Sequence, residues 1–357
     1  MKRIHIYAIL LWVHHDKWQA CQCFLVSGLA MILLLASFFS MLRVVTPSSD
    51  YFKGRIVGGN EAEPNSIPYQ VSLQIRFFWI RSHICGGSIV NENWVVTAGH
   101  CVKQFLISWL PLDAIAGAHD VNNFGPDVQI MKISKRIPHP SYLGNIGPFD
   151  IALLKTEKPF QFNSKVQPVR LPSPDFRVEN VHSEVVLSGW GALKSGVVLP
   201  EMPNKLQEVK VPLLSFEDCN KAINTLSGPL EISILDASSN ICTGPLTGGV
   251  AACSGDSGGP LVEIPSYNNE NEDYNDTNDY SESSEEPNDV IRSTTDTTEN
   301  DEIDKSKVRK GTKSLDERPI LLGVVSWGAW PCGNVGSPTV YTKVSAYLDF
   351  INSHIYE

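Results

Sequence analysis

The stretch AACSGDSGGP, residues 251–260, places a serine next to an acid and among three glycines. Glycine loses more conformational freedom on folding than any other residue, so three in ten positions indicate unusual turns or a close approach of the backbone. Ser257 is therefore a candidate nucleophile. A serine hydroxyl is a weak nucleophile near neutral pH, and it needs a base to take its proton and a group to orient that base.

Two other stretches offer these partners. TAGHC, residues 97–101, places His100 after an apolar strand, and FDIALLK, residues 149–155, places Asp150 at the head of another. A carboxylate at the start of such a strand is costly to bury unless it has a partner. Taken singly, each has a simpler interpretation, because a histidine beside a cysteine is usually structural and an acid before a strand is usually a turn residue.

Together, the order His, Asp, Ser in these motifs closely resembles the chymotrypsin family of serine proteases. Further landmarks of that family follow in the same order: IVGG (56–59), CGGSIV (85–90), PVRLP (168–172), SGWG (188–191) and VSWG (325–328). The resemblance covers residues 56–357 apart from one acidic segment, described below.

The resemblance implies that Ser257 attacks the scissile carbonyl, that His100 takes its proton and that Asp150 holds the imidazole in the right tautomer. Ser326 corresponds to the family serine that hydrogen-bonds the buried aspartate. The backbone N–H groups of Gly255 and Ser257 would form the oxyanion hole. We therefore expect a serine endopeptidase that acts on protein and peptide substrates and uses no metal or cofactor.

A binding protein is the alternative, because members of the family can lose catalysis. Such members usually lack a triad residue, whereas His100, Asp150 and Ser257 are all present. An active enzyme is the favoured interpretation.

Activation by cleavage is a further implication of the resemblance. In this family the precursor is cut before an IVGG-like N-terminus, and the new amine pairs with the acid that precedes the nucleophile. Arg55 followed by Ile56 matches the cut, and Asp256 matches the acid. The resemblance thus predicts a zymogen and an activating protease that cleaves after arginine.

The specificity pocket is also assigned by resemblance. Its floor residue lies six positions before the serine, and there the chain has Ala251, followed by Ala252. A lysine or arginine would be buried there without a partner, which costs several kcal/mol, so cleavage after basic residues is not expected. Gly328, after Ser326 and Trp327, would leave the pocket entrance open, whereas Thr339 would shorten the pocket. We expect small or medium apolar residues before the cut, with large aromatics second.

The elements that must position these residues are mostly strands. Short β-type runs such as YQVSLQI, NWVVTA and ILLGVVSW alternate with Gly, Pro, Asn and Asp turn signals, which predicts an all-β barrel or sandwich. The resemblance narrows this to two six-stranded antiparallel β-barrels of the chymotrypsin type. The last stretch, VSAYLDFINSHI, has helical spacing and predicts a C-terminal helix.

Eight cysteines are present, and Cys21 and Cys23 lie beside or within an apolar run near the N-terminus. The other six have no CxxC spacing, so disulfides in an oxidising compartment are favoured over a metal site. Six cysteines allow fifteen pairings, and spacing does not choose among them. The resemblance implies the pairs Cys85–Cys101, Cys219–Cys242 and Cys253–Cys332.

The N-terminal region indicates export. After a leader of residues 1–22, the run 23–42 has no charged residue and is long enough to span a bilayer. Basic residues precede it, which favours a cytoplasmic N-terminus and an exported protease domain. A retained membrane anchor and a cleaved signal peptide both stay open. Residues 43–55 form a connector or propeptide, and the domain proper is 56–357.

An acidic insertion interrupts that domain at 264–318. Residues 268–304 contain fourteen acids and one arginine, a net charge of −13 against −10 for the whole chain. The rest of the chain has only a slight net positive charge. Nucleic acid is therefore not an expected partner, because phosphate binding needs a strongly basic face. The insertion has too few apolar residues to offset its ordering entropy, so we expect it to be disordered. It could tether a basic partner, or it is a tolerated loop, and Asn275 in it is a glycosylation sequon.

Overall fold

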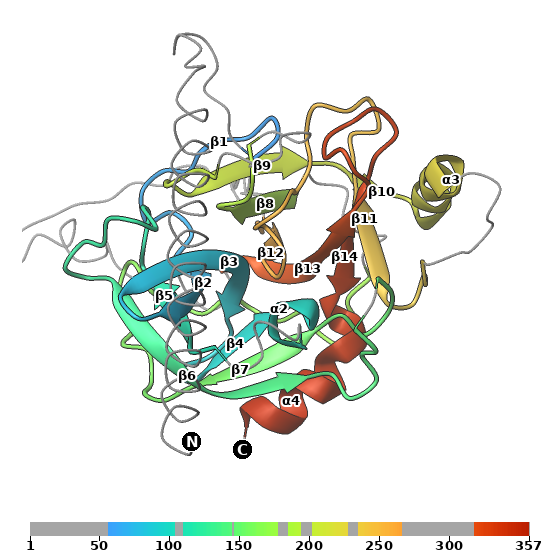
Figure 1. Cartoon of the computed structure of the whole chain (residues 1–357). Coiled ribbons are helices and arrows are strands. Elements are labelled where there is room, and N and C mark those ends of the chain that lie inside the picture. The colour runs from blue at the N-terminus through green and yellow to red at the C-terminus, as the bar shows by residue number, and fades with distance from the viewer. Residues whose placement is uncertain are drawn as a thin grey trace, which may run out of the picture. The chain divides into compact units, whose positions relative to one another are not determined.

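The short aliphatic runs of the sequence form strands in the computed structural model of the chain (Figure 1). The structure describes residues 56–103, 110–144, 146–177, 185–193, 202–227, 235–265 and 318–356. The leader, the apolar run 23–42, the connector with Arg55, and the insertion between 266 and 317 with Asn275 lie outside these residues. Within the described ranges, no helix is long and apolar enough to cross a bilayer.

The first half of the domain is a closed antiparallel barrel, in the order β2-β3-β4-β7-β6-β5. Its strands are β2 (Gln70–Phe77), β3 (Ile80–Ile89), β4 (Trp94–Thr97), β5 (Leu112–Ala116), β6 (Gln129–Pro138) and β7 (Ala152–Thr156). Closure pairs β2 with β5, so no long edge stays open. The aliphatic side chains of β4, β5 and β7 are almost fully buried inside the barrel.

The second half is a curled antiparallel sheet in the order β1-β9-β8-β12-β13-β14-β11-β10. Its strands are β1 (Asn60–Glu61), β8 (Val185–Gly189), β9 (Gln207–Val211), β10 (Leu213–Leu214), β11 (Asn240–Thr243), β12 (Pro260–Glu263), β13 (Ile320–Gly328) and β14 (Thr339–Lys343). The all-β class with a chymotrypsin-type arrangement is confirmed. The second sheet differs from the expected closed barrel because its outer strands, β1 and β10, are only two residues long and have few backbone groups with which to close.

The chain ends in a helix, as the periodicity predicts. A 3₁₀ turn (Val344–Tyr347) leads into α4 (Leu348–Ile355), and Leu348, Ile351 and Ile355 are buried. The described ranges contain two further α-helices, the single turn α2 (His100–Lys103) and α3 (Phe216–Ser227). The apolar pattern does not single out α3, since only Cys219 and Ile223 are buried on it, but its Ser215 cap accepts from the Asp218 N–H at 3.0 Å.

The acidic insertion connects strand β12 to strand β13 of one hairpin. Glu263 pairs with Ile320 at the end of the hairpin next to the insertion, and Pro260 pairs with Val324 at the other end. The residues next to Ser257 and the segment around Ser326 therefore come from the same end of one hairpin. The two stretches lie more than sixty residues apart in the chain, and the sheet brings them together.

Candidate active site

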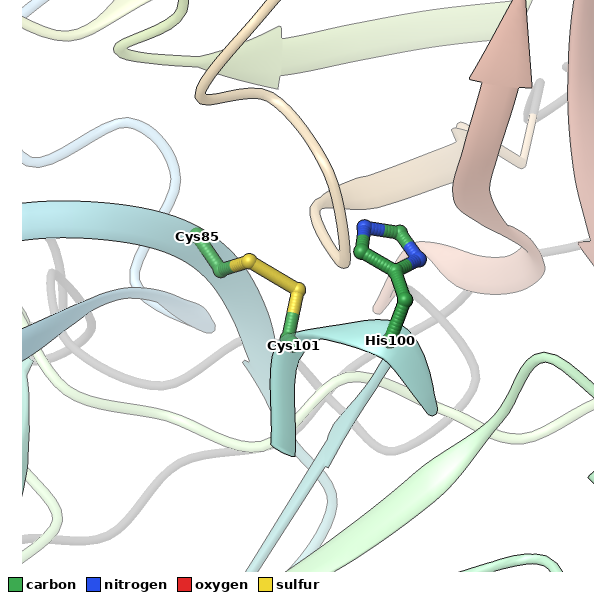
Figure 2. Close-up of side chains that lie close together, drawn as sticks. All are labelled: Cys85, His100 and Cys101. Atoms are coloured by element: carbon green, nitrogen blue, oxygen red, sulfur yellow. A yellow bond between two sulfur atoms is a disulfide. The ribbon is translucent and has the colours of Figure 1, made fainter. Parts of the chain in front are cut away.

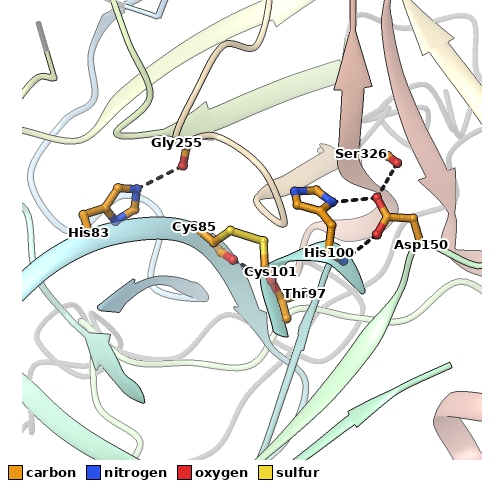
Figure 3. The surroundings of a disulfide bond; sticks show 9 residues. His83, Cys85, Thr97, His100, Cys101, Asp150, Gly255 and Ser326 are labelled. Atoms are coloured by element: carbon orange, nitrogen blue, oxygen red, sulfur yellow. Dashed lines mark hydrogen bonds and ion pairs between the residues drawn. A yellow bond between two sulfur atoms is a disulfide. The ribbon is translucent and has the colours of Figure 1, made fainter. Parts of the chain in front are cut away.

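His100 and Asp150 are held together by two hydrogen bonds. His100 Nδ1 lies 2.8 Å from Asp150 Oδ2, and the His100 backbone N–H donates to Asp150 Oδ1 at 2.8 Å. The Ser326 hydroxyl donates to Asp150 Oδ2 at 2.5 Å (Figure 3). The carboxylate is nearly fully buried, and these three donors offset the loss of water around its charge.

The segment before Asp150 is strained and fixed in place. Phe149 has φ 65°, which is rare for a bulky residue, and its N–H donates to the Tyr347 hydroxyl at 2.9 Å. Its ring stacks on His139 with 4.8 Å between ring centroids. Thr342 Oγ1 also donates to the Asp150 carbonyl at 2.8 Å. Several contacts therefore fix the position of Asp150. Such contacts are needed because a strained backbone persists only where the surrounding structure holds it.

Ser326 reaches the aspartate because β13 is irregular at that point. The pairing of β13 with β14 shifts register between Val325 and Trp327, so Ser326 has no cross-strand partner. An extra residue of this kind re-aims a side chain out of the regular alternation. Ser326 can then donate to Asp150 instead of lying on a sheet face.

Ser257 lies on a loop that is fastened on both sides. The Gly86 N–H of β3 donates to the Ser257 carbonyl at 2.8 Å, and the Gly258 N–H donates to the Val325 carbonyl of β13 at 2.8 Å. Gly258 has φ +76°, and a Cβ there would collide with the Thr97 hydroxyl, three residues before His100. Gly258 thus allows the loop of Ser257 to pack against the segment that carries His100.

Two backbone N–H groups at and near Ser257 have no hydrogen-bond partner among the described residues. Neither the Gly255 nor the Ser257 N–H donates a hydrogen bond to another described residue. Gly255 has φ +99°, a conformation that a residue with a Cβ rarely adopts. Donors of this kind can receive the developing negative charge of a tetrahedral intermediate.

The structure adds His83, a residue that the motifs do not reveal. Its Nε2 lies 3.0 Å from the Gly255 carbonyl oxygen (Figure 3). Its Nδ1 lies 2.7 Å from the Ser72 hydroxyl. Burial lowers the pKa of His83 to about 4 against a weaker opposing effect of the hydrogen bond to Gly255. The only sequence signal is a lone histidine two positions before Cys85.

Asp256, next to Ser257 in the chain, is buried. Its carboxylate accepts from the Gly191 N–H at 2.7 Å and from the Cys253 N–H at 2.9 Å. Burial raises its pKa to about 6, and the two hydrogen bonds oppose that shift only in part. Ile56 is fully buried, and the Val57 carbonyl accepts from the Ala251 N–H at 3.3 Å, beside the same loop.

The residues assigned to the pocket lie together. Ala251 and Ala252 are buried, and the Ala252 N–H donates to the Thr339 hydroxyl at 3.2 Å. Thr339 pairs with Gly328 across β13 and β14. The four residues therefore form one patch, made from the loop before the nucleophile and the ends of two strands.

A cavity of about 400 Å³ lies beside the imidazole, lined by His100, Tyr142, Gly144, Ile146, Asp150, Ser326 and Trp327. A larger cavity, of about 660 Å³, lies between the 167–174 segment and α4, and His100, Asp150 and Ser257 do not line it. The smaller cavity is therefore the one that borders both His100 and Asp150.

The described residues contain three disulfides, Cys85–Cys101, Cys219–Cys242 and Cys253–Cys332, the pairs that the resemblance implies. Cys85 and Cys101 lie close to His100, as Figure 2 shows, and this trio has the residue types of a metal site. Their sulfurs are bonded to each other, so they offer no thiolate to a metal. Cys101 instead fixes α2, and hence the histidine, to β3.

A family model described as Trypsin matches residues 56–266, more than half of the chain. The chain belongs to the trypsin family of serine proteases. The family is one of serine-type endopeptidases, so protein substrates are implied. The three disulfides in the described part of this chain indicate an oxidising, extracellular compartment.

Curated relatives of this trypsin-family chain come from several animals. Ovochymase-2 of Mus musculus is 39% identical over 216 residues, 60% of this chain and 33% of that protein. Lectizyme of Glossina austeni is 33% identical over 312 residues, 85% of this chain and 87% of that protein. Trypsin-2 of Salmo salar is 32% identical over 299 residues, 84% of this chain and 94% of that protein. The chain thus spans about a third of ovochymase-2 but most of the other two.

Proposed function

We propose that this trypsin-family chain is an active serine endopeptidase with Ser257 as nucleophile, His100 as base and Asp150 as orienting acid. The observation that carries the proposal is the His100–Asp150 pair, 2.8 Å apart and supported by Ser326. With Nδ1–H donated to the carboxylate, the His100 Nε2 atom is left as the free base.

The reaction then follows in two balanced halves. His100 takes the Ser257 proton as Oγ attacks the scissile carbonyl, and the Gly255 and Ser257 N–H groups receive the oxyanion. His100 next gives that proton to the leaving amine, which departs and leaves an acyl-enzyme. Water, deprotonated by His100, attacks the acyl carbon, and Ser257 leaves with the proton restored.

The proposal includes activation by cleavage after Arg55. The freed ammonium of Ile56 would pair with Asp256, whose burial with two N–H partners supports this role. The pairing would order the loop that carries the oxyanion donors. A protease that cleaves after arginine is the implied activator, and export past the membrane would precede the cut.

The primary specificity is proposed to be apolar. Ala251 and Ala252 supply no charge for a basic side chain, and Thr339, next to Ala252, limits the depth. Residues such as Ala, Val, Leu or Met before the cut fit this chemistry. The acidic insertion, at the far end of the β12–β13 hairpin, is proposed to stay clear of the cleft and to suit a basic partner.

A fluorophosphonate probe tests the catalytic proposal. After cleavage at Arg55, the probe should label the protein, whereas Ser257→Ala and the uncleavable Arg55→Gln should stay unlabelled. A peptide library scanned at the residue before the cut then tests the pocket. Absence of labelling in folded, processed protein would indicate a binding protein instead, and dominant cleavage after Lys or Arg would contradict the apolar pocket.

A further inference from the structure

Met202 lies against Gly255, one of the two residues whose N–H groups are proposed to form the oxyanion hole. Gly255 has φ +99°, and a Cβ on it would collide with the methyl carbon Cε of Met202. The same Cβ would lie 3.2 Å from the Gly191 Cα and 3.7 Å from the Trp190 carbonyl oxygen. The methyl group of Met202 therefore closes the space that a side chain at position 255 would need.

Hydrogen bonds fix the turn around Gly255 at its carbonyl groups. His83 Nε2 lies 3.0 Å from the Gly255 carbonyl oxygen (Figure 3), and the Ala192 N–H donates to the carbonyl of the preceding Ser254 at 2.8 Å. The Gly255 N–H donates to no described residue. Hydrogen bonds thus hold the two carbonyls of this turn, and the packing of Met202 holds the α-carbon.

The chain after Met202 is anchored, which defines where its side chain lies. Pro203 has a fixed φ angle and also restricts the backbone of Met202 before it. The carbonyl of Asn204 accepts from the Val121 N–H at 2.8 Å, and its side-chain oxygen accepts from Asn122 Nδ2 at 2.7 Å. The first half of the domain therefore holds the segment that brings Met202 to the nucleophile loop.

Met202 is accessible to small solutes. It is 38% exposed, whereas Met131 of β6 is partly buried against the core of the first half. Residues 56–357 contain no other methionine, and the remaining three precede the proposed cut at Arg55. Met202 is thus the more exposed of the two methionines that the processed domain retains.

An exposed thioether is oxidised by small peroxides. Hydrogen peroxide transfers one oxygen atom to Sδ, so that an S–O bond forms, the O–O bond breaks and the second oxygen leaves as water. The sulfur loses two electrons and the peroxide gains them. The resulting sulfoxide is polar and disrupts apolar packing, and methionine sulfoxide reductases convert it back to the thioether.

Oxidation of Met202 would remove the apolar contact from the α-carbon of Gly255. The S–O group keeps its hydrogen bonds to water only by turning away from Gly255 and Gly191, because burial without a partner is costly. Gly255 would then have more freedom about its positive φ, and its N–H would be less firmly directed at the oxyanion. Donors of this kind accelerate the reaction because they are fixed beforehand, so turnover should fall.

We propose that Met202 is an oxidation site that controls turnover: a small peroxide converts it to the sulfoxide, which weakens the oxyanion hole, and reduction restores the active enzyme. This inference rests on the proposed function, because it requires Gly255 to be an oxyanion donor. It adds to that function a reversible chemical control, separate from the cleavage at Arg55.

The test follows the kcat of processed wild type on a short coumarin substrate during treatment with hydrogen peroxide. Peptide mass spectrometry of the same samples measures the fraction of sulfoxide at Met202 and at Met131. We expect kcat to fall by about tenfold in proportion to the sulfoxide at Met202, with little change in KM, because the donor is displaced rather than removed. Treatment with methionine sulfoxide reductase should restore kcat.

Three variants assign the effect to this side chain. Met202→Leu keeps an apolar contact and has no sulfur, so its kcat should be the same before and after peroxide. The matched control Met131→Leu should lose kcat as wild type does. Met202→Gln places a polar group of similar length at this position, and it should lower kcat without peroxide while its melting temperature stays close to that of wild type.

The other outcomes separate the inference from the proposed function. Complete sulfoxide at Met202 with unchanged kcat would overturn the inference and leave the proposed function standing. Equal losses of kcat in wild type and Met202→Leu would do the same, since another residue would then be responsible. No cleavage and no fluorophosphonate labelling by any untreated protein would overturn both.

Discussion

His83 Nε2 lies 3.0 Å from the carbonyl oxygen of Gly255, although the two residues are 172 positions apart in the chain. A carbonyl only accepts, so Nε2 carries the proton. In the neutral ring, Nδ1 is then an acceptor, and the Ser72 hydroxyl, 2.7 Å away, must donate to it. Ser72 in turn accepts from Gln74 Nε2 at 3.2 Å. A directed chain of hydrogen bonds thus leads from Gln74 of β2 to the loop that carries Gly255 and Ser257.

We expect His83→Ala to lower kcat by about tenfold with little change in KM, because Gly255 would be held less firmly. His83 is a positioning residue, so the loss should be smaller than the hundredfold or more that follows removal of an oxyanion donor. His83→Gln keeps an N–H donor and should restore part of kcat. Steady-state kinetics on a short coumarin substrate give both values; a lower melting temperature with unchanged kcat would reduce His83 to a structural role.

The stability of the uncleaved chain should depend weakly on pH between 4 and 6.5, because two buried groups oppose each other. Burial raises the pKa of Asp256 to about 6, so the stability from its protonated form is complete below about pH 4 and is lost as the pH rises through 6. Burial lowers the pKa of His83 to about 4, so its contribution is complete above pH 6.5 and is lost as the pH falls toward 4.

Single substitutions should separate the pH dependences of stability that Asp256 and His83 cause. Uncleaved Asp256→Asn should gain stability as the pH rises from 4 to 6.5, and uncleaved His83→Gln should lose it, each by about 3 kcal/mol at most. Urea unfolding at several pH values measures both. Equal slopes for the two variants would contradict this account.

Ser326→Ala should lower kcat by about tenfold, because Asp150 Oδ2 would lose a charge-assisted donor and hold His100 less firmly. Thr342→Val is the matched control, since it removes a hydrogen bond to the Asp150 carbonyl and spares the carboxylate. The control should lose about 1–3 kcal/mol of stability and keep its kcat. Kinetics and thermal unfolding of both variants separate the two effects, and equal losses of kcat would show that only the backbone position matters.

Thr339→Gly should shift the preferred residue before the cut toward Phe and Tyr, because the pocket becomes deeper. It also leaves the buried Ala252 N–H without its acceptor, at a cost of about 1–3 kcal/mol. Thr339→Ser keeps the acceptor and removes a methyl group, whereas Thr339→Val keeps the volume and removes the acceptor. If volume decides specificity, the serine variant should shift partway and the valine variant should not; the reverse order would assign specificity to the hydrogen bond.

The sequence alone determined the residue types, their order and the family. Ser257, His100 and Asp150 lie in short motifs that can be recognised from neighbouring residues alone. Ala251 is assigned to the pocket by its position six residues before Ser257. Strand runs and the helical spacing from 344 to 355 also appear locally, because period-two and period-3.6 burial are properties of neighbouring residues.

The tertiary structure decided what holds these residues in place. The bulge at Ser326, the support of Phe149 by Tyr347 and the bond from His83 to Gly255 all join segments distant in the chain. The close approach of Met202 to Gly255 likewise joins two separate loops. Such contacts depend on which strands pair and in which register, and no window of adjacent residues contains that information.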